Sequence, residues 1–133
     1  MRVVLDTNVL VSALFWGGQP RRVVDLAIAG RLQAVTSPEL LAELEQVLAE
    51  GFAVPQDRVE LVLRDVLSYA EVAVPLEEVD IPVRDRDDAK VLAAARAGRA
   101  ACIVTGDRDL LEIGEVHGIA ILTVREFLSS FVG

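Results

Sequence analysis

Apolar residues follow one another in several short runs of the sequence. Residues 2–5, 101–105 and 119–123 are largely aliphatic on consecutive positions, which is typical of strands buried on both faces of a sheet. A weaker run at residues 72–74 predicts a fourth strand.

Between these runs, apolar residues recur every three or four positions and predict helices. Ser37 is a favourable N-cap and Pro38 fits the first position of a helix whose apolar stripe includes Leu44. Further helices are predicted over about residues 21–29, 56–70, 87–97, near 110 and over 124–131. Because strands alternate with helices, we expect an α/β sandwich with a mostly parallel sheet. Such sheets bind ligands beyond the carboxyl ends of their strands.

Composition indicates one soluble domain. The chain has 133 residues, of which 53% are hydrophobic, and no linker divides it, so we expect a single domain over residues 1–133. Cys102 is the single cysteine and lies in an apolar run, which favours a core position in a reducing cytoplasm. No apolar run approaches the about 20 residues that span a bilayer, and we expect no leader segment.

The net charge of −8 argues at first against a nucleic-acid partner, because phosphate binding normally depends on Lys and Arg. If five of the acids share a metal site, however, 16 acidic groups remain against 13 basic ones. Charge alone therefore leaves the class of partner open.

Two aspartates follow predicted strands directly. Asp6 comes after the run at residues 2–5, and Asp107 follows the run that ends at Thr105. Both are therefore expected at the carboxyl edge of the sheet, where two carboxylates would converge. The alternative is that each aspartate only caps a helix or turn.

Two further acids lie on predicted helices. Asp88 precedes Val91 by three residues and shares the face that docks on the sheet. The alternative for Asp88 is capping, because Asp85 and Asp88 have the spacing of a capping box and Asp87 could be the N-cap; for Asp85 we expect capping alone. A turn of about 100° per residue places Glu43 at the border of the apolar stripe, where it reaches a cleft or is simply solvated.

Together these acids point to metal chemistry. Carboxylates brought close together repel one another unless a cation lies between them, and all-oxygen ligands suit Mg²⁺ or Mn²⁺. Such ions activate water and stabilise the entering and leaving oxygens of a phosphodiester.

Two other features are less informative. His117 is the single histidine and is expected in a loop. Residues 15–18, Phe-Trp-Gly-Gly, form an apolar patch that we expect to pack in the core, with a partner-binding surface as the alternative.

Four blocks in order carry a resemblance that covers nearly the whole chain. They are DTNV (6–9), SPELLAEL (37–44), RDRDDAKVL (84–92) and VTGDRDLL (104–111), followed by residues 119–128. With these blocks the chain resembles the PIN-domain family, and within it the toxins of toxin–antitoxin systems.

The resemblance implies a fold, an activity and roles for particular residues. It implies a three-layer α/β/α sandwich whose central, mostly parallel sheet has four or five strands. It further implies Mg²⁺- or Mn²⁺-dependent cleavage of single-stranded RNA leaving a 5′-phosphate, a cognate antitoxin and a homodimer. The implied metal-binding and catalytic acids are Asp6, Glu43, Asp88 and Asp107, with Asp109 as an auxiliary metal ligand and Asn8 and Thr105 as supporting residues. One departure from the pattern is Arg86, where this branch often has proline.

Other classes fit less well. A haloacid-dehalogenase-type phosphatase needs a second Asp where Asn8 stands, and a response-regulator receiver needs a lysine after a late strand, whereas Lys90 lies in a predicted helix. Phosphate-binding glycine fingerprints are missing from the sequence. A non-catalytic PIN-like scaffold for RNA or protein binding stays open as the alternative.

Overall fold

A twisted sheet forms the centre of the fold. The computed structural model describes residues 1–76 and 86–131. Within them the sheet has six strands in the order β3-β2-β1-β4-β6-β5. The strands are β1 (Arg2–Leu5), β2 (Gln33–Thr36), β3 (Ala70–Val72), β4 (Cys102–Val104), β5 (Glu115–Val116) and β6 (Ile119–Leu122). All pairings are parallel except that of β5 with β6. The mostly parallel sheet is thus confirmed, but the implied count of four or five strands was too low, because the short antiparallel β5 adds a sixth strand at the edge.

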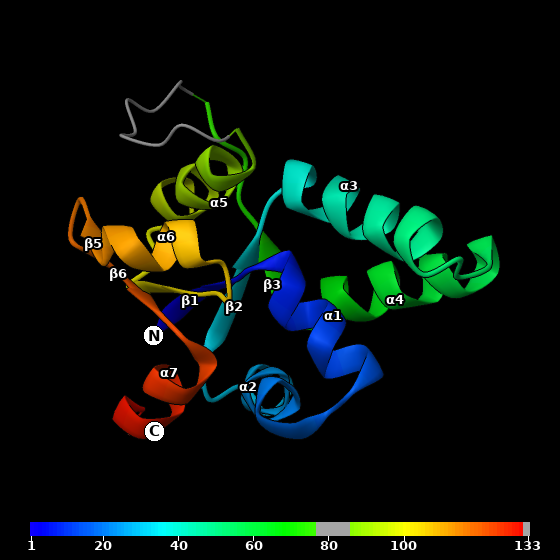
Figure 1. Ribbon diagram of the computed structural model, residues 1–133, viewed down its shortest axis with the longest axis horizontal. Helices are drawn as coiled ribbons and strands as arrows, with labels where there is room; N and C mark the ends of the chain where they lie inside the picture. The colour runs from blue at the N-terminus through cyan, green and yellow to red at the C-terminus, as the bar shows by residue number, and fades with distance from the viewer. Residues whose placement is uncertain (77–85, 132–133) are drawn as a thin grey trace.

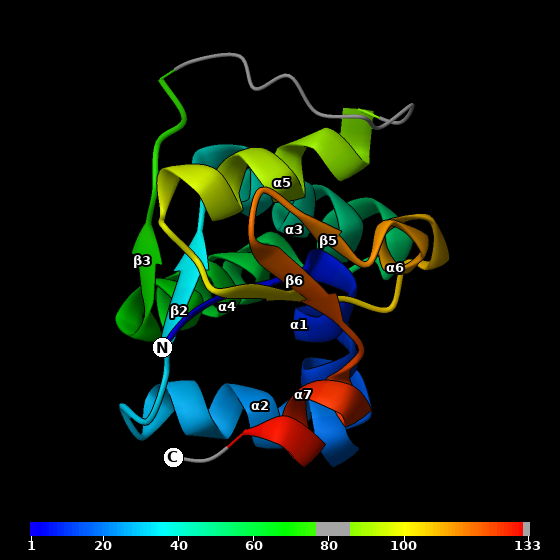
Figure 2. The same cartoon turned by 90° about the vertical axis from the view of Figure 1, so that its left-hand side faces the viewer.

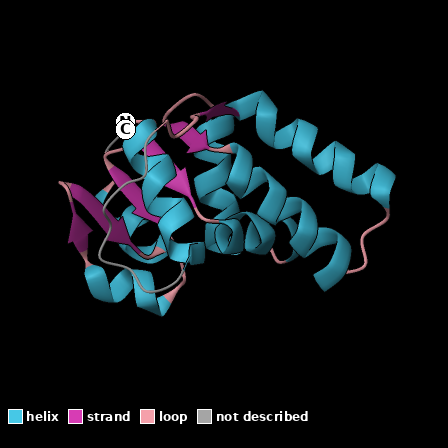
Figure 3. Cartoon of the chain, turned by 90° about the horizontal axis from the view of Figure 1, so that it is seen from above, coloured by secondary structure: helices cyan, strands magenta, loops and turns pink. Residues whose placement is uncertain are grey.

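Helices cover both faces of this sheet. They are α1 (Thr7–Phe15), α2 (Gly18–Ile28), α3 (Pro38–Gln46), the π-helical turn η1 (Val47–Gly51), α4 (Gln56–Tyr69), α5 (Arg86–Ala97), α6 (Arg108–Ile113) and α7 (Val124–Ser130). Figure 2 shows α5 above the sheet and α2 with α7 below it. In Figure 1, α3 and α4 lie side by side and extend away from the sheet. Seen from above, the strands gather at one side and long helices occupy the other (Figure 3). The expected three-layer sandwich is confirmed.

The buried strands supply both apolar layers. Successive side chains of a strand point to opposite faces. Accordingly, Val4 and Ile103 pack with α5 residues such as Leu92 in one core cluster. Val3 packs with residues of α2 and α7 in another, which includes Phe127. This two-sided burial explains why these strands are apolar on consecutive positions.

Several elements differ from the sequence-based expectation, among them β5 and η1, which it did not predict. The apolar pattern did not predict α1 or β2, and it placed the strand before α5 at residues 72–74, whereas β3 is Ala70–Val72. Val74 is exposed beyond the end of this strand. Because β3 lies at the edge of the sheet, its residues are not fully buried, and an apolar pattern does not show where the strand begins and ends.

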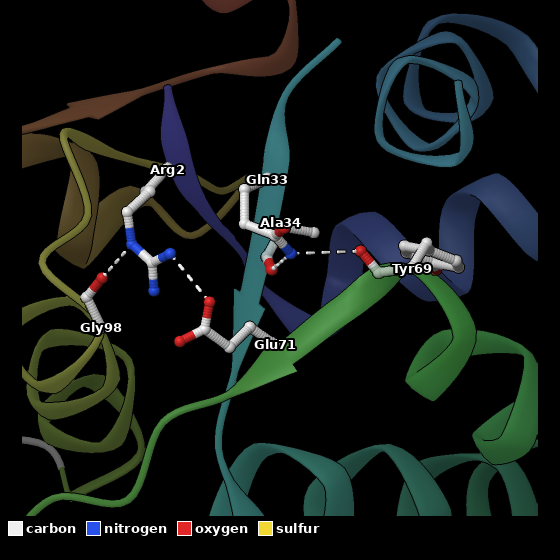
Figure 4. A network of polar contacts seen from close by, with 6 residues as sticks. All are labelled: Arg2, Gln33, Ala34, Tyr69, Glu71 and Gly98. Carbon is white, nitrogen blue, oxygen red and sulfur yellow. Dashed lines mark hydrogen bonds and ion pairs between the residues drawn. The ribbon is translucent and has the colours of Figure 1, made fainter. Parts of the chain in front are cut away.

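Polar contacts tie the amino ends of the first three strands together (Figure 4). Arg2 Nε donates to the Gly98 carbonyl at 2.6 Å, and its guanidinium also pairs with Glu71 at 2.8 Å. Gln33 Nε2 donates to the Tyr69 carbonyl at 3.4 Å. These contacts lie at the strand ends opposite those that lead to Asp6 and Asp107.

Among the helices of the described ranges, none is long and apolar enough to cross a bilayer.

Candidate active site

A pocket of about 410 Å³ opens at the carboxyl ends of β1 and β4. From β1 the chain proceeds outward to β2 and β3, and then returns to place β4 on the other side of β1. Such a switch in strand order creates the crevice in which open α/β sheets bind ligands. The pocket is lined by Asp6, Asn8, Val11, Ser12, Glu43, Val47, Phe52, Asp88, Val91 and Asp107. The four predicted acids therefore face one pocket.

Three hydrogen bonds hold the buried Asp6 carboxylate. The side chain is only 6% exposed, and its Oδ1 accepts from the backbone N–H of Thr7 at 2.8 Å. The Oδ2 atom accepts from the Thr105 hydroxyl at 2.7 Å and from Asn8 Nδ2 at 3.1 Å. The carboxylate is thus held in one orientation from three sides.

Thr105 and Asn8 connect the loop after β4 to the loop after β1. The Thr105 hydroxyl accepts from the backbone N–H of Asp107 at 3.0 Å, in addition to donating to Asp6. Asn8 Oδ1 accepts from the Gly106 N–H at 3.1 Å. Both residues predicted to support the acids make direct contact with Asp6.

Burial raises the pKa of the Asp6 carboxyl above its ordinary value. Hydrogen bonds from Thr105 and Thr7 oppose this shift, and the negative charges of Glu43 and Asp107 add to it. The ionised form of Asp6 is therefore less favourable in this pocket than in water, and a positive charge beside it would offset that cost.

Glu43 reaches the pocket from α3. Ser37 caps this helix by accepting from the Leu40 N–H at 3.1 Å, as the sequence predicted. The Glu43 side chain is 20% exposed, which matches its expected place at the border of the buried face. Lys90 Nζ of α5 lies 3.2 Å from Glu43 Oε2, an ion pair that brings a positive charge beside the acids.

Asp88 lies in the first turn of α5 and is buried against the pocket. The competing explanation by capping depended on Asp85, which lies outside the described residues, and on the side chain of Asp87, which is likewise not described. The inward position expected for Asp88 is confirmed.

Capping and pocket lining occur together at two of the acids. Asp6 is the N-cap of α1, and Asp107 is the N-cap of α6, where it accepts from the Asp109 N–H at 2.9 Å. The two interpretations offered by the sequence are therefore compatible. Asp109 is exposed and is not among the residues that line the pocket, so the structure does not bring it to the other four acids.

The donor set suits a hard divalent ion in its chemistry. Among the residues that the structure describes, the pocket wall offers carboxylate, amide and hydroxyl oxygens and includes no Lys, Arg, His or Cys side chain. Among the described residues, however, no three acidic, His or Cys side chains are already arranged as a metal-binding group. Residues that fit such an ion are thus present around one pocket, without a preformed cage.

Sequence reasoning missed part of the pocket wall and misplaced one patch. Phe52 and Val47 line the pocket because η1 ends α3 with a π-helical turn, for which no sequence signal was evident. The aromatic pair Phe15 and Trp16 was expected in the core, but the structure exposes both side chains, by 41% and 70%. The core interpretation of this patch was wrong.

The fold and the pocket together define an α/β domain whose acids gather at the switch point of a mostly parallel sheet. Residues 2–109 match the family model of the PIN domain, and the chain therefore belongs to the PIN-domain family. No curated protein matches the chain.

A solved structure also shares this fold. The chain is similar to one in the crystal structure of VapBC2 from Rickettsia felis bound to a DNA fragment from their promoter, with a TM-score of 0.67 and 17% identity. The match covers 91% of this chain and 97% of that chain. At this identity, the likeness concerns the fold.

Proposed function

We propose that this PIN-domain protein is an endoribonuclease that hydrolyses phosphodiester bonds of single-stranded RNA with Mg²⁺ or Mn²⁺. PIN domains are generally nucleases, which supports the reaction class. The observation that carries the proposal is that Asp6, Glu43, Asp88 and Asp107, far apart in sequence, line one pocket at the switch point.

The four acids would hold the ion, and Asp109 stays a prediction as an auxiliary acid. A divalent ion bound here supplies an activated water and charge stabilisation at the phosphate. Thr105 and Asn8 already hold the Asp6 carboxylate in one orientation, so little conformational entropy is lost in ordering it when substrate binds. The acids themselves repel RNA phosphates, which makes a cation necessary for the substrate to approach.

The test is cleavage of end-labelled single-stranded RNA by the full chain. We expect cleavage with Mg²⁺ or Mn²⁺, none with EDTA, and a loss of at least about a hundredfold for Asp6→Asn, because a principal ligand charge is removed. Glu45→Gln is a matched control, since Glu45 is an exposed acid of α3 outside the pocket. Equal cleavage in every sample would identify a contaminating nuclease and contradict the proposal.

A non-catalytic RNA-binding or protein-interaction scaffold is the second candidate. Two observations favour it: among the described residues no metal-binding group is preformed, and Lys90 already pairs with Glu43. Under this alternative, RNA or protein binding persists while Mg²⁺ and Mn²⁺ produce no turnover. The cleavage assay therefore separates the two candidates.

The biological setting that we propose is that of a toxin held inactive by a cognate antitoxin. Its support is the resemblance of the sequence to toxin members of the family, together with the fold shared with a chain of the VapBC2 structure. We further propose a homodimer in the cytoplasm. The free, buried Cys102 agrees with a reducing compartment, because the chain has no second cysteine for a disulfide. Burial also raises the pKa of Cys102 to about 11, which keeps the thiol protonated.

A further inference from the structure

Three aromatic side chains form an exposed cluster beside the acid pocket. Phe15 and Trp16 end α1, and Phe52 follows η1. The rings of Phe15 and Phe52 are stacked, with centroids 4.5 Å apart and planes 19° from parallel. Trp16 meets the edge of this pair, with its ring centroid 5.7 Å from Phe15 and 6.1 Å from Phe52.

The exposure of this aromatic cluster is unusual within the chain. The sequence has six aromatic residues, and the other three, Tyr69, Phe127 and Phe131, are buried or half-buried. In the cluster, Phe15 and Phe52 are about two-fifths exposed, and Trp16 is 70% exposed. The stacked phenylalanine pair therefore supports an indole that presents most of its surface to solvent.

The cluster is continuous with the pocket because Phe52 belongs to both. Phe52 lines the pocket together with Glu43 and Asp88, while its ring stacks on Phe15. A polymer whose phosphate reaches the acids therefore passes close to the exposed indole. Because the aromatic cluster adjoins the pocket through Phe52, the RNA substrate is the ligand that we expect on it.

We propose that the aromatic cluster is a base-stacking platform for single-stranded RNA, with Trp16 as the residue that contacts an unpaired base. This inference rests on the proposed function, since it assigns a contact to the substrate of the same pocket. Planar bases stack on exposed aromatic side chains in single-stranded nucleic-acid sites. The platform acts in binding and positioning, with no part in the chemical step.

The charge of the protein gives a reason for such a platform. At a net charge of −8, the chain gains little from general attraction to phosphates. Stacking requires no phosphate neutralisation, so it supplies affinity that the charge does not. Stacking affinity also depends only weakly on salt, which distinguishes it from Lys and Arg contacts.

Trp16 provides its own probe, because it is the single tryptophan of the chain. With Mg²⁺ present and the Asp6→Asn substitution to prevent cleavage, we expect an oligouridine RNA of about eight nucleotides to quench the Trp16 fluorescence. An abasic ribose-phosphate chain of equal length should quench it far less. Equal quenching by both chains would overturn the proposal, since it would show that the base makes no contact.

Variants in the same Asp6→Asn background with Mg²⁺, measured by anisotropy of a labelled oligouridine, complete the test. We expect Trp16→Ala to weaken binding about tenfold at low and high salt, and Trp16→Phe to restore most of the affinity. Leu61→Ala is the matched control, because Leu61 is 58% exposed on α4 and does not line the pocket. Circular dichroism verifies that each variant is folded.

The outcomes separate this inference from the proposed function. Unchanged RNA affinity in Trp16→Ala, alongside RNA cleavage by the wild type, would overturn the platform alone. Unchanged affinity together with a lower molar mass by light scattering would identify a protein-contact surface and also overturn it. Quenching and the tenfold loss without metal-dependent cleavage would support the platform and contradict the nuclease.

Discussion

Thr105 links Asp6, which follows β1, to Asp107, which follows β4. Its hydroxyl donates to Asp6 Oδ2 and accepts from the Asp107 N–H, and the side chain is fully buried. A buried hydroxyl that bonds two polar neighbours stabilises the fold mainly because its loss removes a hydrogen bond from each of them. Thr105 therefore links the stability of the site to its geometry.

Replacing Thr105 by valine tests this link. Thr105→Val keeps the side-chain shape but removes the hydroxyl, so we expect the free energy of unfolding to fall by about 1–3 kcal/mol. Thr105→Ser keeps the hydroxyl and should lose less, because only one methyl group is removed. Urea denaturation measures both variants. Equal losses would show that the methyl group, and not the hydrogen bonds, carries the effect.

The raised pKa of Asp6 predicts a stability that depends on pH. Because burial raises this pKa in the folded state, Asp6 stabilises the fold while protonated, below its unfolded pKa, and this contribution is lost as the pH rises through the folded value. In metal-free buffer at neutral pH, Asp6→Asn should therefore have a higher Tm than the wild type, since asparagine also serves as an N-cap.

The difference in Tm between Asp6→Asn and wild type should shrink as the pH is lowered through the acid range. Scanning calorimetry across this range provides the measurement, with Asp25→Asn as a control because Asp25 is exposed and paired on the surface. A stabilisation by Asp6→Asn that stayed constant with pH would exclude ionisation of Asp6 as its cause.

At the scale of single elements, those with local signals were predictable. Ser37 and Pro38 mark the start of α3 and Gly98 follows the end of α5, as expected from the sequence. By contrast, β2 has only four residues, QAVT, and is defined by its pairing with β1 and β3. The hydrophobic pattern of a short segment does not predict its pairing with strands that are distant in the sequence. The helix α1 was missed because it continues directly from β1 through Asp6 without a turn signal.

Gly98 is predictable as a helix stop, but its packing role becomes evident only in the fold. A Cβ at this position would lie 2.4 Å from Val35 Cγ1 and 3.2 Å from the Ala94 carbonyl oxygen. Val35 is buried in β2 and has a stiff β-branched side chain, so it cannot move aside cheaply. The close approach of α5 to the sheet, which positions Asp88, depends on this glycine.

We accordingly expect Gly98→Ala to lower the free energy of unfolding by about 1–3 kcal/mol through overpacking. Gly51→Ala is a suitable control, because a Cβ there would lie 3.9 Å from Val47 Cγ1, an ordinary contact. Thermal denaturation of the two variants gives the comparison. A Gly98→Ala protein as stable as Gly51→Ala would mean that α5 can shift away from β2 without cost.

At the scale of the molecule, the site could be predicted only in part. Its acids were identifiable because strand ends and helix faces can be located from local patterns, and the pocket collects Asp6, Glu43, Asp88 and Asp107. The ion pair between Lys90 and Glu43 depends on how α5 packs against α3, which no local pattern encodes. The same limit applies to the exposed cluster around Trp16, since Phe52 reaches it through a π-helical turn.

The concentration of negative charge in one pocket leads to a prediction about the whole fold. A ligand that binds only the folded state stabilises it, by about 2.7 kcal/mol when its concentration is a hundredfold above Kd. Mg²⁺ or Mn²⁺ should therefore raise the Tm of the wild type, whereas Na⁺ at equal ionic strength should not. Glu43→Gln should reduce the rise because it removes a ligand charge from the pocket.

Glu45→Gln tests whether this stabilisation is local, because it removes one negative charge from the same helix on the exposed side. If the ion binds in the pocket, this variant keeps the full rise in Tm that Glu43→Gln loses. If the ion is attracted only by the net charge of the molecule, both variants lose the same small fraction. Equal reductions in the two variants would therefore mean that the acids form no specific metal site, because diffuse attraction depends on net charge and not on position.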